Sequence, residues 1–186
     1  SGDGGLAAQA RIARPAGLAF DTAGNLYLAD TANQRVRRIS VAGTISTVVG
    51  TGTKGSSGDG GNAVSAELSD PWGLAFDSLG NLYIADSGNH RVRKVTPSGI
   101  ISTVAGIGTS GFSGDGGPAT GARLSGSLGV AADNSGSIYI ADTGNHRVRK
   151  VTPDGSISTM AGDGRNEFSG DGGPAAAASL WYPYSV

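Results

Sequence analysis

The two histidines, His90 and His146, are the side chains best suited to proton transfer or zinc binding in this chain. A metal or catalytic site needs several ligands that converge on one point. The histidines instead occupy equivalent places in two copies of the sequence Gly-Asn-His-Arg, 56 residues apart. We therefore expect each imidazole to form hydrogen bonds within its own loop, with ligand contact as the alternative, and we predict no catalytic residue, metal site or cofactor.

Nucleophilic chemistry is not indicated either. The chain has no cysteine, so a thiol nucleophile and disulfides are both excluded. No Gly-x-Ser-x-Gly sequence lies between a predicted strand and a helix with a histidine available as base. The recurring Gly-Asp-Gly-Gly supplies only one carboxylate per copy, fewer than a calcium site needs unless adjacent loops pool their oxygens. We expect this aspartate to close its own turn.

Aspartates and arginines recur together in a pattern that predicts structural ion pairs. Asp86 precedes Arg91 by five residues and Arg93 by seven, across what reads as a short turn between strands. A charge-assisted hydrogen bond across such a turn would fix the strand register, and Asp86 could form it with either arginine. The predicted clamp residues in the three copies are Asp30, Asp86, Asp142, Arg35, Arg91 and Arg147.

Charge and hydropathy bound the class of partner. Nine of the 14 basic residues lie in three short motifs, which could suggest a surface for nucleic acid, but the net charge is −1 and the sequence pI is near 6.0. Counterion release would therefore drive little binding, and we expect solvated strands paired with nearby acids and no nucleic-acid partner. No apolar run approaches the roughly 20 residues of a membrane span, so no membrane insertion is expected.

The chain is a tandem repeat with a period of 56 residues. The tetrapeptide Gly-Asp-Gly-Gly begins at Gly2, Gly58, Gly114 and Gly170, and other motifs keep the same offset. Because 186 = 3 × 56 + 18, we predict one domain made of three full repeats, 2–57, 58–113 and 114–169, followed by a partial repeat, 170–186.

Each repeat reads as four short antiparallel strands, which makes the fold all-β. In the second repeat the predicted strands are Trp72–Asp77, Asn81–Asp86, Arg91–Thr96 and Ile100–Ala105, separated by Gly- and Pro-containing turns. The first two are apolar and the last two alternate, so burial is expected to fall from the first strand outward. A meander with that gradient is typical of a propeller blade. A helical turn is expected within 118–124 of the long connection.

The repeat resembles the NHL-repeat β-propellers, in the long-repeat form found in bacteria. The motifs that carry the resemblance are Ala85–Val95 and Ala141–Val151, while the first repeat departs from them at Ala32 and Gln34. The resemblance implies a ring of about six blades. Three blades form only a sector, so we expect a homodimer or missing chain to complete the ring. The aromatic end of the chain, with Trp181, Tyr182 and Tyr184, is the candidate assembly segment, unless it is an arbitrary boundary.

The resemblance favours a noncatalytic scaffold that presents a loop face to a protein, peptide or glycan, within a larger extracytoplasmic bacterial protein. The alternatives are a recently duplicated or engineered half-propeller without a ligand, and a lyase-like or hydrolytic enzyme with a metal in its central channel. The candidate ligand-face residues are Asn89, His90, Phe112, Asn145, His146 and Phe168.

Overall fold

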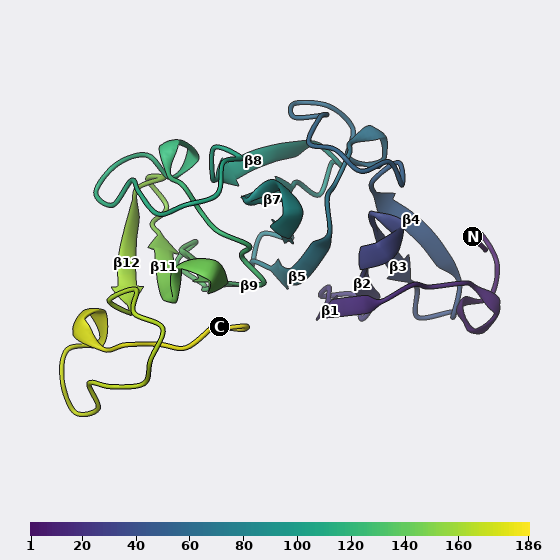
Figure 1. Ribbon diagram of the computed structural model, residues 1–186. Helices are drawn as coiled ribbons and strands as arrows, with labels where there is room; N and C mark the ends of the chain where they lie inside the picture. Colours follow the sequence, from purple (N-terminus) through teal and green to yellow (C-terminus); the bar gives the residue numbers. More distant parts are fainter.

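The computed structural model describes residues 1–186 and contains three four-stranded antiparallel sheets, arranged as an arc of blades (Figure 1). Within each sheet the strands follow one another in sequence order, as predicted for a propeller sector. Blade 1 comprises β1 Pro15–Phe20, β2 Leu26–Asp30, β3 Arg35–Ile39 and β4 Ile45–Val49; blade 2 comprises β5 Pro71–Phe76, β6 Leu82–Asp86, β7 Arg91–Val95 and β8 Ile101–Ala105; blade 3 comprises β9 Gly129–Ala132, β10 Ile138–Asp142, β11 Arg147–Val151 and β12 Ile157–Ala161.

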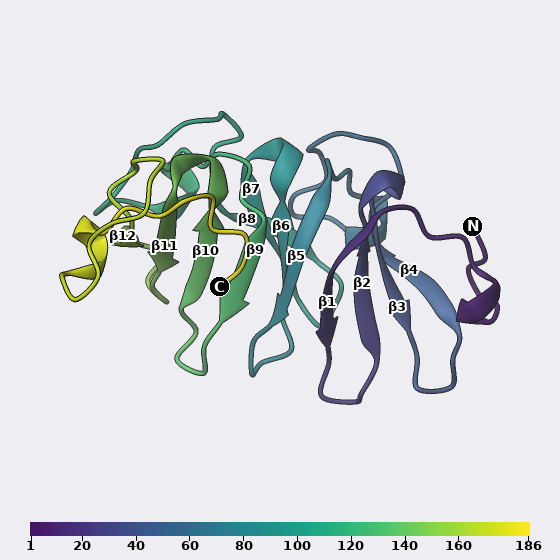
Figure 2. The same cartoon turned by 60° about the horizontal axis from the view of Figure 1, so that its bottom comes forward.

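The tight hairpins lie at one end of every blade, at the bottom of Figure 2, and are stabilised by their turn residues. Between β5 and β6, the carboxylate of Asp77 accepts the backbone N–H groups of Leu79 and Asn81 at 3.0 and 2.8 Å. Gly80 follows with φ +79°, a conformation that costs a glycine little. We call this end of the arc the turn face, and the opposite end, where the long connections run, the loop face.

Seven single 3₁₀ turns complete the secondary structure, and three of them join the second and third strands of a blade. The predicted helical turn in 118–124 is one of the others, Ala119–Gly121. No helix is both long and apolar enough to cross a membrane. The turns are η1 Ala7–Gln9, η2 Thr31–Asn33, η3 Ala63–Ser65, η4 Ser87–Asn89, η5 Ala119–Gly121, η6 Thr143–Asn145 and η7 Ala175–Ala177.

The predicted burial gradient is wrong, because the second strand of each blade is the most buried and the first is not. Every residue of β6 is buried, whereas β1 leaves Leu18 59% exposed and Phe20 65% exposed. The first strands lie on the inner side of the arc (Figure 1). β1 is exposed because no blade packs against its outer face, whereas Leu74 and Val130, the equivalents of Leu18, are buried against a neighbouring blade. The second strands are covered on both faces.

The hydrophobic core lies between neighbouring blades and is closed by residues of the long connections. One cluster joins blades 1 and 2 around Ile84 and Leu68, and a second joins blades 2 and 3 around Ile140 and Leu124. Leu68 and Leu124 precede β5 and β9 and are fully buried. Each junction is therefore an extended apolar interface rather than a line of isolated contacts.

The inner strands approach one another through glycine. A Cβ on Gly17 would lie 2.4 Å from the carbonyl oxygen of Trp72, and one on Gly73 would lie 2.4 Å from that of Leu128. Any larger side chain at these positions would force the strands apart. The spacing of the blades at the inner side is thus fixed by the absence of a side chain.

Candidate functional site

An ion triad ties each blade to the Gly-Asp-Gly-Gly segment that precedes it, which we call the glycine loop; two members of the triad are buried and the loop aspartate is partly exposed. In blade 2, Asp86 and Arg93 are both fully buried, and their Oδ2 and Nη1 atoms are 3.4 Å apart. Arg93 Nη2 also donates to Asp59 Oδ1 at 2.7 Å, so one guanidinium joins two carboxylates from distant segments. The equivalent triads are Asp30–Arg37–Asp3 and Asp142–Arg149–Asp115.

The clamp arginines are Arg37, Arg93 and Arg149. Of the two arginines considered for Asp86 the structure therefore pairs Arg93, and the choice of Arg35, Arg91 and Arg147 for the three copies is wrong. Arg91 is opposite Asp86 in register, but its Nη2 donates to the carbonyl oxygen of Ile107 at 3.2 Å. Arg35 and Arg147 likewise donate to backbone carbonyls. Side chains two residues apart share one face of a strand, so the strand pattern alone does not distinguish Arg91 from Arg93. The difference comes from Asp59, which reaches Arg93 from 34 residues away.

Burial raises the pKa of two clamp aspartates, Asp86 and Asp142. It raises the pKa of Asp86 to about 6, although bonds from Asn89, the Ser69 N–H and Arg93 act in the opposite direction. Burial raises the pKa of Asp142 in the same way. The loop partner in blade 3 differs, because hydrogen bonds from Thr159 and Arg149 lower the pKa of Asp115 despite partial desolvation.

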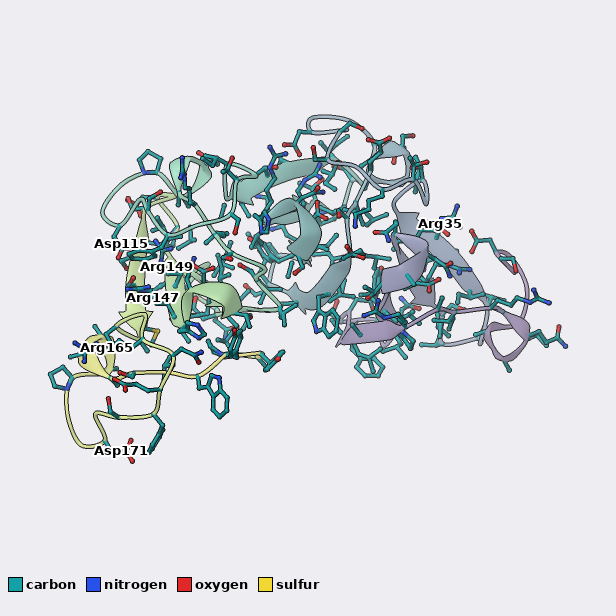
Figure 3. The ribbon with its side chains drawn as sticks, in the orientation of Figure 1. Arg35, Asp115, Arg147, Arg149, Arg165 and Asp171 are labelled. Atoms are coloured by element: carbon teal, nitrogen blue, oxygen red, sulfur yellow. The ribbon has the colours of Figure 1, made fainter.

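The aspartate of Gly-Asp-Gly-Gly does not close its own turn, contrary to our prediction. A backbone bond does so, from the N–H of Gly61 to the carbonyl of Gly58 at 3.1 Å, which leaves the carboxylate of Asp59 free to reach Arg93. Figure 3 shows Asp115 beside Arg149 in blade 3, whereas Asp171 lies at the far end of the terminal loop. Asp171 forms no ion pair.

The histidines connect neighbouring blades rather than bonding within their own loop. His90 has φ +52°, and its Nδ1 accepts the backbone N–H of Gly126 at 3.1 Å. His146 accepts the N–H of Tyr182 at 3.2 Å in the same manner. Gln34 departs from the family motif but makes the equivalent contact between blades 1 and 2. Its Oε1 accepts the Asp70 N–H at 2.6 Å. Sequence reasoning missed Gln34.

Most of the predicted ligand-face residues are engaged inside the fold. Asn89 Nδ2 donates to Asp86 at 2.7 Å and to the Gly55 carbonyl at 2.6 Å, and Asn145 repeats both bonds. The ring of Phe112 lies 3.8 Å beneath the guanidinium carbon of Arg147, a cation–π contact. Phe168, the equivalent of Phe112 in the partial repeat, is 78% exposed.

The C-terminal segment packs on blade 3 of its own chain. The Thr143 hydroxyl donates to the Pro183 carbonyl at 2.7 Å, as Thr31 does to Pro71 in the first junction. Tyr182 meets the His146 ring edge to face at 4.5 Å between centroids. The two other predicted assembly residues remain on the surface, with Trp181 71% exposed and Tyr184 61% exposed.

The inner side of the arc forms a shallow hollow of about 500 Å³, lined by the first strands and Tyr184. No group of three or more His, Asp or Glu side chains gathers anywhere in the molecule to hold a metal ion. The lining of the hollow is mostly apolar and glycine-rich, and no pair of titratable side chains faces the hollow. Tyr184 and Ser185 supply the only side-chain hydroxyl groups in this lining, and no carboxylate, imidazole or amine lies beside them in it.

Comparison with known families and proteins gives a consistent assignment. The NHL repeat model matches residues 68–95 and 128–151, and the teneurin NHL domain model matches residues 1–57. Human teneurin-4 is 34% identical over an alignment of 211 residues that covers the whole chain, and mouse teneurin-1 is 32% identical over the same length. The chain spans only 7% and 8% of these relatives, respectively.

Solved structures share the fold. A Bacteroides thetaiotaomicron protein of unknown function superimposes with a TM-score of 0.72 at 24% identity, covering 93% of this chain and 42% of that one. An auxiliary nutrient binding protein from Bacteroides ovatus gives 0.67 at 24% identity, covering 93% and 43%. The virginiamycin B lyase of Staphylococcus aureus gives 0.52 at 18% identity, covering 78% and 40%.

Proposed function

Because the chain belongs to the NHL-repeat family of β-propellers, we propose that it is a noncatalytic binding scaffold whose three blades are completed to a ring of six by a second copy. Two copies of three blades supply the number that suits a propeller, and a two-fold ring is the simplest closed assembly. The absence of converging titratable side chains in the hollow supports a scaffold over a catalyst.

One observation supports the assembly. On the outer side of blade 1, the face that no other blade covers, the backbone group that would bond to a neighbouring blade has no partner. Arg14 has φ +49°, like Asp70, Gly126 and Tyr182 at the three occupied junctions. Each of those three residues donates its N–H to a glutamine or histidine of the preceding blade, whereas the Arg14 N–H has no acceptor in the chain. A preceding blade with a histidine at the matching place would satisfy it.

Blade 3 of a second copy carries the groups that this side of blade 1 requires. Its His146 Nδ1 and Thr143 hydroxyl would receive the Arg14 N–H and contact the Pro15 carbonyl, as they now do for Tyr182 and Pro183. The chain's own residues 170–186 repeat the register of residues 2–18 and must leave that position for the ring to close. The exposed Leu18 and Phe20 would then face the inner strand of another blade.

Solution mass tests the assembly. Analytical ultracentrifugation is expected to give a species near 37 kDa, twice the 18.4 kDa of one chain. The comparison uses a chain that ends at residue 169, so that its own terminal segment does not compete for His146. In that background His146→Ala should weaken the dimer by about tenfold, because it removes the acceptor from the intermolecular junction. His90→Ala is the matched control, since His90 serves only the internal junction. A monomer at all concentrations, or equal weakening by both variants, contradicts the two-copy ring.

The loop face is the expected place for a protein, peptide or glycan to bind, but it offers few free groups. Among the six residues predicted for ligand contact, Asn89, His90, Asn145, His146 and Phe112 are held by contacts within the fold. Phe168 remains the one without such a contact and is the residue whose change to alanine tests this face. Unchanged binding in that variant would direct attention to another surface.

A further inference from the structure

The basic residues of the third strands fall into three sets with different fates. The first set donates to backbone carbonyls and consists of Arg35, Arg91 and Arg147. The second forms the clamp and consists of Arg37, Arg93 and Arg149. The third set consists of Arg38, Lys94 and Lys150, and none of these forms an ion pair. Each is opposite a tyrosine in register: Tyr27 for Arg38, Tyr83 for Lys94 and Tyr139 for Lys150.

Arg38 lines a groove between blades 1 and 2 that opens near the turn face. The groove has a volume of about 360 Å³, and no acidic residue lines it. Its polar lining includes Thr47 and Asn62, while Phe76 and Val95 contribute apolar surface. Arg38 is half-buried and forms no ion pair. Its Nε is buried without an acceptor, as is that of Arg91, so the terminal nitrogens are the ones that a ligand in the groove would contact.

Two carboxylates at the turn face form no ion pair with Arg38. Asp21 and Asp77 line an adjoining pocket at the turn face, but both are committed to their own turns. Asp21 accepts from the Asn25 side chain at 2.7 Å, and Asp77 accepts from Asn81 at the same distance. These bonds lower the pKa of both aspartates against the opposing effect of desolvation. Arg38 is thus a cation in a groove of mixed polar and apolar lining that contains no carboxylate.

The equivalent groove between blades 2 and 3 provides an internal comparison. Its volume is about 380 Å³ and Lys94 takes the place of Arg38, but Asp154 is also part of the lining. Pro118 stands where the first groove has Asn62, and no phenylalanine lines it. The second groove therefore carries both charges, has less aromatic surface and lacks the planar guanidinium that binds a carboxylate through two parallel bonds.

We propose that the groove at Arg38 binds a short peptide segment in which a glutamate or aspartate adjoins an apolar side chain. The carboxylate would accept from Arg38 while the apolar side chain contacts Phe76 and Val95. Tyr27 and Phe76 meet edge to face at 4.8 Å between centroids and form no flat platform on which a sugar ring would stack. This inference rests on the proposed binding function and names its ligand.

A peptide titration tests the groove. The probe is a fluorescein-labelled, end-capped hexapeptide of alternating leucine and glutamate, measured by fluorescence anisotropy, with glutamine in place of glutamate in the control peptide. Arg38→Met is expected to weaken binding of the acidic peptide at least about tenfold, as loss of a charge-assisted pair should. Lys94→Met removes the same charge and is expected to change affinity less than about twofold.

Several outcomes overturn the proposal. Equal losses in the two variants would mean unspecific attraction to positive charge, and equal binding of the glutamine peptide would mean that the carboxylate is not recognised. Tighter binding of a trigalacturonate would identify a uronic-acid glycan as the occupant instead. Arg38→Lys keeps the charge and, with a thermal melt, separates lost recognition from lost folding.

The same samples distinguish this inference from the ring. The groove lies wholly between blades 1 and 2 of one chain, so it exists whether or not a second copy binds. A monomeric chain that binds the acidic peptide contradicts the two-copy ring alone. A dimer that fails to bind it contradicts the groove alone.

Discussion

The junction between blades 2 and 3 and the outer side of blade 1 are built from equivalent residues, but only the junction has its polar groups paired. At the junction, the His90 imidazole holds the Gly126 N–H, and Leu124 is fully buried between the sheets. On the outer side, the Arg14 N–H has no acceptor, and Ile12, the equivalent of Leu124, is 36% exposed. The repeat therefore encodes an interface, not only a blade.

The comparison also separates contacts that stabilise a blade from contacts that join blades. The ion triad of Asp59, Arg93 and Asp86 lies within one repeat and is complete in all three blades. The histidine contact and the threonine contact to the next proline cross from one repeat to the next. Substitutions in the two groups should therefore have different consequences.

The largest effect is expected at the clamp. Arg93→Met leaves Asp86 buried without its cation and should lower the free energy of unfolding by about 3–5 kcal/mol, measured by urea denaturation. Arg91→Met is the matched control, since Arg91 donates only to an exposed carbonyl and should cost less than about 1 kcal/mol. Similar losses from both variants would show that the clamp does not depend on the buried arginine.

The pH dependence of the clamp should be the next largest effect. Because burial raises the folded-state pKa of Asp86 to about 6, above its unfolded value, its stabilising contribution is complete below pH 4 and is lost as pH rises through 6. The unfolding free energy of the wild type, relative to Asp86→Asn, should fall by roughly 3 kcal/mol between pH 4 and 7. A pH-independent difference would place the Asp86 pKa near its ordinary value.

The junction histidine should have an intermediate effect. His90→Ala leaves the Gly126 N–H without an acceptor and should cost about 1–2 kcal/mol in a thermal or urea unfolding experiment. His90→Gln should restore most of that loss, because Gln34 already makes the same contact between blades 1 and 2. If glutamine fails to restore stability, the imidazole has a role other than accepting this hydrogen bond.

The glycine loops offer the smallest contrast. Asp115→Asn weakens the contacts to Arg149 and Thr159 and should cost about 1 kcal/mol of unfolding free energy, because Asp115 is half exposed. Asp171→Asn changes a residue that has no cation beside it, so its effect should stay within about 0.5 kcal/mol. A larger loss of unfolding free energy at Asp171 than at Asp115 would contradict the distinction between a glycine loop whose aspartate pairs with an arginine and one whose aspartate does not.

Much of the fold follows from the sequence because the repeat and its turns are local features. The four strands per repeat and the hairpins at Gly80 and Gly99 are read directly from turn residues and alternation. The burial gradient could not be read this way, because whether the first strand is covered depends on the adjacent blade, which covers Leu74 and Val130 but not Leu18. The choice of Arg93 over Arg91 depends on how the glycine loop folds back over the sheet, which brings Asp59 from 34 residues away.

The candidate site was harder to predict because its residues look alike in sequence and differ in their neighbours. Asn89 and His90 are polar loop residues, and such residues commonly contact ligands, yet both bond within the arc. Arg38 stands beside Arg37 in the same motif, but only Arg38 faces a groove without a carboxylate. Adjacent residues of a strand point to opposite faces, and the environment of each face comes from segments far away in the chain.

The glycines of the inner strands have a consequence for the curvature of the whole assembly. Gly17 and Gly73 bring each inner strand against the backbone of the next, and so set the angle through which one blade is rotated from its neighbour. That angle determines how many blades complete a full turn. An alanine at Gly73 would widen one step of the arc while leaving each blade intact, so the blade count of a closed ring is encoded in residues that have no side chain.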